Sequence, residues 1–164
     1  SDVVLDSTYP IYKFEFINCH PDGDQRDLTF NGSTDSGSNY NTTKTTTWFE
    51  AYHFENDSAA ALAYHTGSDL AQSTSFQTIS NGLGNANDDS CNGELWLYNP
   101  SSTVFVKHFL CTASSNYRVG LPGLINSWIA GYMNTTSAVN AIQFKMESGN
   151  IDAGTIKLYG IKDS

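Results

Sequence analysis

Acidic side chains are the residues of this sequence best suited to chemistry. The loop 20–27, "HPDGDQRD", places Asp22, Asp24 and Asp27 close together, and carboxylate oxygens are the ligands that calcium prefers. The loop lacks the acidic register and the distal bidentate glutamate of an EF-hand. We therefore take these three aspartates as candidate calcium ligands, beside the alternative that they lie on a solvated turn. No other cofactor or metal is predicted.

Hydrolysis of a glycosidic bond requires two carboxylates across the scissile bond, one of them with a raised pKa. The sequence supplies glutamates in number, but nothing in their spacing singles out a pair. The four histidines have no triad context, and neither G-x-S-x-G nor H-E-x-x-H occurs. We predict no catalytic residue and no enzymatic activity, and keep a small hydrolase as a lesser alternative. The glutamates considered are Glu15, Glu50, Glu55, Glu94 and Glu147.

Three cysteines, Cys19, Cys91 and Cys111, make an odd number without a C-x-x-C pair. The favoured interpretation is three small buried residues. The alternative is a single disulfide, for which Cys91 and Cys111 are the natural partners in sequence.

Aromatic residues recur in alternation with polar ones. Most aromatic residues at this spacing belong to a core, but exposed rings stack on sugars or fill subunit interfaces. Trp96 and Trp128 are the candidate surface-binding residues. The aromatic residues of the later strands that could point outward are Trp48, Tyr52, Trp96, Tyr98 and Trp128.

The elements that must position these residues are strands. In "IYKFEFI" (11–17), Tyr12, Phe14 and Phe16 share one face and Lys13 and Glu15 the other, as in a half-buried strand. Further strands are predicted at 27–31, 42–55, 93–99, 103–111, 126–134, 141–147 and 155–161, with less regular ones at 60–66 and 74–79.

Turns between these runs predict how the strands are connected. "PSS" (100–102) predicts a hairpin between 93–99 and 103–111, and the loop 148–154 predicts a closing hairpin. The segment 57–63 fits either a short helix or strand and irregular structure, of which we favour the second. About eight to ten strands at this spacing predict an all-β fold, a single antiparallel β-sandwich that is jelly-roll-like and has little or no helix.

Length and charge limit the function further. The 164 residues fit one domain, 1–164, and the first residue is Ser1, which leaves room for a preceding N-terminal segment. The net charge of −9 removes the attraction to phosphate on which nucleic-acid and anionic-membrane binding depend. No apolar run approaches the ~20 residues of a membrane-spanning helix. We therefore expect no nucleic-acid partner and no membrane insertion.

The sequence also resembles a known group of proteins. The opening 3–41, the segment "LYNPSSTVFVKHF" (97–109), the closing phrase "AGYMNTTSAVNAIQFKMESGNIDAGTIKLYGI" (130–161) and their order are similar to virion structural proteins of marine and cyanobacterial tailed phages (cyanophages). The resemblance implies a non-enzymatic β-sandwich displayed on the particle. It carries no catalytic residue to this chain.

The expected function is therefore that of a structural protein of a bacteriophage virion, located on the particle surface. It would be an appendage or tail-fibre head that contacts the host, or a capsid decoration protein. We expect a homo-oligomer, by analogy a homotrimer, with capsid or tail proteins and a host surface glycan as partners. The alternative is a carbohydrate-binding module of a secreted or virion-associated protein, with exposed aromatic rings as its sugar platform.

Overall fold

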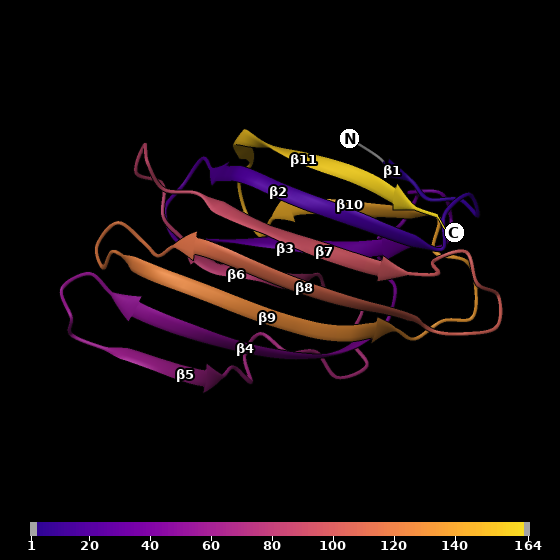
Figure 1. The fold of residues 1–164 in the computed structure, drawn as a ribbon, viewed down its shortest axis with the longest axis horizontal. Coiled ribbons are helices and arrows are strands. Elements are labelled where there is room, and N and C mark those ends of the chain that lie inside the picture. The colour runs from indigo at the N-terminus through magenta and orange to yellow at the C-terminus, as the bar shows by residue number, and fades with distance from the viewer. Residues whose placement is uncertain (1–2, 163–164) are drawn as a thin grey trace.

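Two antiparallel sheets packed face to face make up the fold (Figure 1). The computed structural model describes residues 3–162, within which all regular elements are strands and no residue is helical. The sheet orders are β1-β10-β3-β6 and β11-β2-β7-β8-β9-β4-β5. The predicted all-β sandwich is thus confirmed. The strands are β1 (Val3–Val4), β2 (Ile11–Pro21), β3 (Arg26–Ser33), β4 (Lys44–Phe54), β5 (Ala60–Tyr64), β6 (Gln77–Leu83), β7 (Cys91–Tyr98), β8 (Lys107–Asn116), β9 (Gly123–Met133), β10 (Ala141–Met146) and β11 (Ile151–Ile161).

The core lies between the sheets and is built by alternation. Phe14 and Phe16 of β2 face inward as predicted and are almost completely buried. Both rings meet Phe144 of the smaller sheet edge-on, with centroids 5.1 and 5.2 Å apart. Such contacts add to the gain from burying the rings, so this aromatic cluster ties the two sheets together.

The predicted closing hairpin is wrong. Strands β10 and β11 follow one another in sequence, but β10 pairs with β3 in the smaller sheet and β11 with β2 in the larger one. The alternation of Ile142 and Met146 correctly predicts their burial, yet a period of two does not specify which strand is the neighbour. Strand β11 begins at Ile151, earlier than predicted, and its pairing with β2 is irregular around Gly154, which has a φ of 109°.

At the level of local elements, one further prediction needs correction and another is confirmed. Strands β7 and β8 pair as predicted, but β8 begins at Lys107, so the connection is 99–106 and not the three residues 100–102. The hydroxyl of Ser102 accepts hydrogen bonds from the backbone N–H groups of Val104 and Phe105, which holds this stretch in a turn. In the segment 57–63, irregular structure leads into strand β5, which pairs with β4, and no helix is present, as the favoured interpretation predicted.

The three cysteines are buried and free, as the favoured interpretation predicted. The alternative disulfide is wrong. Cys91 lies opposite Ser115 of β8, whereas Cys111 lies opposite Leu95. Four residues along a strand span about 13 Å, and a disulfide bridges Cα atoms no more than about 7 Å apart.

Residues 3–162 contain no helix long and apolar enough to cross a membrane.

Candidate functional site on the outer face of the larger sheet

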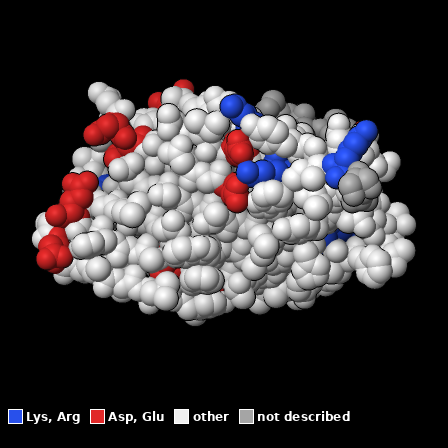
Figure 2. All heavy atoms as spheres, in the orientation of Figure 1, with Lys and Arg blue, Asp and Glu red and all other residues white. Residues whose placement is uncertain are grey.

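The outer face of the seven-stranded sheet is the face turned away from the smaller sheet, and it carries the candidate residues. In the view of Figure 1 this sheet lies in front, and Figure 2 shows that most of its surface is uncharged. Two cross-strand rows define the centre of this face, and every member points outward by alternation. The first row is Lys13, Trp96, Leu110, Ala130 and Thr47, and the second is Glu15, Glu94, Thr112, Trp128 and Phe49.

A hollow of about 400 Å³ lies between the two predicted tryptophans. Trp96 stands on β7 and Trp128 on β9, with β8 between them, so the two strands lie about 10 Å apart. The two side chains are also offset along the strands, because Trp96 is opposite Leu110 and Trp128 is opposite Thr112. Thr112 and Ala130 line the space between them, and these small side chains leave it open. We call this hollow the aromatic groove.

Both tryptophan rings are held in place by neighbours. The indole N–H of Trp96 donates a hydrogen bond of 2.9 Å to Oε1 of Glu94, and Lys13 Nζ lies 5.1 Å from the ring centroid. Trp128 stacks on Phe49 with centroids 5.4 Å apart and ring planes within 15°. Rings fixed in this way lose little conformational entropy when a ligand binds.

The charges beside the groove neutralise one another. Lys13 Nζ lies 2.9 Å from Glu15 Oε1 and 2.8 Å from Glu94 Oε2. Hydrogen bonds from this ammonium lower the pKa of both carboxyl groups, and the same contacts raise the pKa of Lys13. A general acid for glycoside cleavage needs a raised pKa, so Glu15 and Glu94 are suited to positioning Trp96 and not to proton transfer.

A second hollow of about 400 Å³ adjoins the aromatic groove. It shares Tyr98, Leu110 and Ala130 with the groove and continues to His108 and Tyr132. The rings of His108 and Tyr132 are 5.7 Å apart on the paired strands β8 and β9. We call it the tyrosine hollow.

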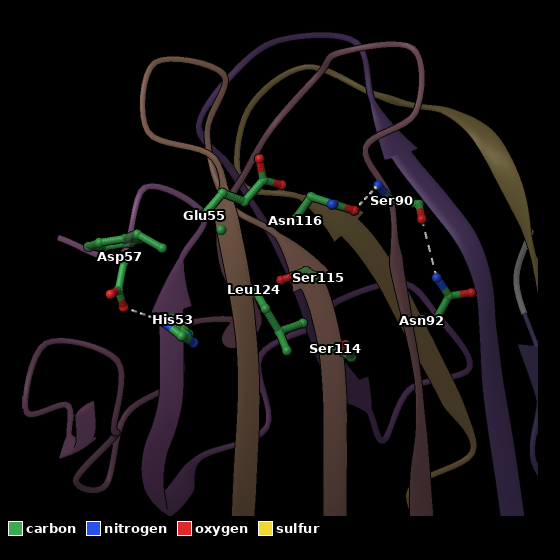
Figure 3. A pocket seen from close by; sticks show the side chains of 11 residues that line it. His53, Glu55, Asp57, Ser90, Asn92, Ser114, Ser115, Asn116 and Leu124 are labelled. Carbon is green, nitrogen blue, oxygen red and sulfur yellow. Dashed lines mark hydrogen bonds and ion pairs between the residues drawn. The ribbon is translucent and has the colours of Figure 1, made fainter. Parts of the chain in front are cut away.

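A third hollow, of about 470 Å³, lies at the other end of β8 and β9 (Figure 3). His53 Nε2 lies 3.0 Å from Asp57 Oδ1 on one side of it. On the other side Asn116 Oδ1 accepts the N–H of Ser90, and Leu124 stands between the two sides. We call it the polar hollow, because amides, hydroxyls and the His53–Asp57 pair are among the side chains that line it.

The remaining aromatic candidates divide between the two faces. Trp96, Tyr98 and Trp128 line the aromatic groove. Trp48 instead points inward and is fully buried, with its indole N–H donating 3.1 Å to the carbonyl of Thr78. An outward orientation of Trp48 is therefore wrong. Tyr52 is half-buried and tilts against a neighbouring ring of its own strand.

The three candidate calcium ligands turn to different neighbours. Asp22 accepts a hydrogen bond from the side chain of Asn150, and Asp24 accepts one from the backbone N–H of Val119. Asp27 accepts the N–H of Gly82, and burial raises the pKa of its carboxyl group. Within residues 3–162 no three His, Cys, Asp or Glu side chains are grouped to hold a metal ion.

Glu50 is a buried acidic residue, and its contact with His65 is not predicted from the sequence. Glu50 follows the inward phase of Trp48, is buried, and lies 2.9 Å from His65 Nε2. Burial raises the pKa of Glu50. Glu50 is two residues after Trp48, so alternation alone places it on the inward face. A sequence pattern that expects apolar residues inside does not predict a buried carboxylate there.

No protein family model, curated protein or solved structure matches this chain. The resemblance to phage virion proteins therefore stays a prediction.

Proposed function

We propose that this chain is a non-enzymatic structural protein of a tailed-phage virion, displayed on the particle as the head of an appendage that holds a host surface glycan. The observation that carries the proposal is the aromatic groove. Two tryptophans on separate strands face one hollow in an otherwise uncovered sheet. Fixed aromatic rings beside polar side chains suit a pyranose, which offers an apolar face for stacking and hydroxyls for hydrogen bonds.

The charges around the groove support binding over turnover. Lys13 lies between Glu15 and Glu94 and keeps both in the ionised form. Glu50, whose pKa is raised, lies on the opposite side of the sheet from the groove. Within the described residues, no two carboxyl groups therefore face each other across the groove with one protonated to act as the acid and the other ionised to act as the base.

The binding half of the proposal is tested with a glycan array and two variants. Trp96→Ala and Trp128→Ala should each weaken binding at least about ten-fold, the loss expected for a central aromatic contact. Phe76→Ala is the matched control, because its ring carries Lys145 Nζ at 4.3 Å, as Trp96 carries Lys13, but lies outside the groove. Glycan binding that is unchanged in both tryptophan variants would contradict the role of the groove.

The location is tested separately. Antibodies against the chain, imaged on purified virions by electron microscopy, should label the tips of appendages. Label distributed over the capsid would instead favour a decoration protein. Light scattering of the isolated protein should give the mass of a homotrimer.

A further inference from the structure

The three hollows of the outer face lie in one line along β8 and β9. The aromatic groove and the tyrosine hollow share Tyr98, Leu110 and Ala130. Thr112 lines the groove and Ser114 the polar hollow, and these are successive outward positions of β8. On β9 the line runs from Leu124 to Tyr132, which is eight residue steps, or about 26 Å at the rise of a strand.

Asn126 occupies the outward position between the polar hollow and the aromatic groove. It lies on β9 between Leu124 and Trp128, opposite Ser114. Its side-chain oxygen is buried and has no hydrogen-bond partner among the described residues. Buried amide oxygens are nearly always paired, so this one calls for an explanation. Because it gives up no hydrogen bond, rotation of the amide toward the surface costs little.

We infer that the three hollows form one extended site, in which a single linear neutral polysaccharide lies along β8 and β9. This inference rests on the proposed function and adds the ligand class and its path. In it the rotated amide oxygen of Asn126 accepts a ligand hydroxyl where the chain passes from the aromatic groove into the polar hollow.

The electrostatics of the face specify a neutral ligand. Lys13, the cation at the groove, is already paired with two carboxylates, so it offers little attraction to a uronate or sulfate group. The polar hollow adds Glu55 and Asp57, and the whole chain carries a net charge of −9. An anionic polysaccharide would be repelled by the carboxylates of the polar hollow and would find Lys13 at the aromatic groove already paired.

The chemistry of the ends also suits a sugar chain. The polar hollow offers the amides of Asn92 and Asn116 and the hydroxyl of Ser114, which donate to and accept from sugar hydroxyls. The tyrosine hollow offers Tyr98 and Tyr132, whose rings stack while their hydroxyls remain at the wet edge. Each hollow therefore combines apolar surface with hydrogen-bonding groups, as the binding of a sugar requires.

The test is calorimetric titration of the protein with oligosaccharide ladders, from disaccharide to hexasaccharide, of a β-glucan, a mannan and a galactan. Anionic alginate oligosaccharides serve as the charged comparison. Affinity should rise with chain length for one neutral ladder and be absent for alginate. Asn126→Ala should weaken hexasaccharide binding roughly two- to ten-fold, the loss of one neutral hydrogen bond, and leave disaccharide binding and the thermal midpoint unchanged.

Tyr132→Ala, at the far end, should likewise reduce the gain from chain length. Phe76→Ala should change nothing. Wild-type binding that depends on Trp96 but is equal for disaccharide and hexasaccharide would overturn the extended site and leave the proposed function standing. A wild-type protein that binds none of these glycans would overturn both the extended site and the binding half of the proposed function. Tighter binding of alginate than of every neutral ladder would overturn the ligand class.

Discussion

The two faces of the seven-stranded sheet use the same residue type for opposite purposes. Trp48 and Trp128 lie on the paired strands β4 and β9, one register position apart, since Trp48 is opposite Ile129 and Trp128 is opposite Phe49. Trp48 is 0% exposed in the core, whereas Trp128 lines an open groove. The phase of the strand, and not the residue type, therefore decides whether a ring stabilises the fold or is available to a ligand.

The lysines repeat this contrast. Lys44 points inward from β4, where it is fully buried and donates to Asn31 Oδ1 at 2.6 Å and to the carbonyl of Thr42 at 2.7 Å. No carboxylate is among these partners. Lys13 points outward from β2 between two carboxylates. Burial lowers the pKa of Lys44 to about 7, while ion pairing raises that of Lys13.

The largest effect that tests the comparison is the loss of the inner tryptophan. Trp48→Ala should lower the free energy of unfolding by about 3–5 kcal/mol, because it leaves a cavity and removes one of the hydrogen bonds that the carbonyl of Thr78 accepts, another coming from Gln77 Nε2. Trp128→Ala should cost about 1 kcal/mol, mainly its stacking on Phe49. Urea unfolding measures both. Equal losses would show that the outer ring is part of the structural core and would break the comparison.

Much of the sandwich could be predicted because alternation is a local signal. In 11–17 the inward residues are all aromatic and both charged residues, Lys13 and Glu15, point outward, so the phase of β2 is unambiguous. In β4 both phases are mixed. Its inner face includes Glu50 beside Trp48, and its outer face includes Phe49. The sequence of β4 therefore does not determine which way Trp48 points.

The candidate site could be predicted only in part. Trp96 and Trp128 were identifiable as outward candidates, but their meeting in one groove depends on the order β7-β8-β9 in the sheet. Pairing partners come from the whole fold, as the separation of β10 and β11 into different sheets shows. The role of Asn126 is likewise invisible in sequence, because an unpartnered oxygen is recognised only from its surroundings.

The second effect concerns the two lysines and pH. The folded pKa of Lys44 lies at about 7, below its ordinary 10.5, so above pH 7 the unfolded chain binds more protons than the folded one. The contribution of Lys44 to the free energy of unfolding is therefore fully present above about pH 10.5. It is lost as the pH falls toward 7, at up to about 1.4 kcal/mol per pH unit. Urea unfolding at pH 7.0–8.5 should show this slope in the wild type.

Substitution separates the two lysines in that experiment. Lys44→Met should flatten the slope, and it leaves Asn31 Oδ1 its hydrogen bonds from Gly32 and Thr42. Lys13→Met should keep the slope, because Lys13 is protonated in both states over this range. A slope that survives in Lys44→Met would mean that another buried group titrates there.

The smallest effect concerns the three cysteines. They lie on the inner face of the seven-stranded sheet, as Trp48 does, so their reactivity tests how well this face is closed to solvent. Burial raises the pKa of Cys19 to about 11 and that of Cys91 to about 12, so at pH 8 only roughly a thousandth of Cys19 is the reactive thiolate. All three thiols should resist a thiol-reactive dye in the folded protein and react together in urea.

The count of reactive thiols in unfolded, unreduced protein can contradict this prediction. A count of one instead of three would indicate a disulfide between Cys19 and Cys91, which lie opposite each other. Cys111→Ser, opposite Leu95, is the control that lowers the count by a single thiol without removing either member of that pair.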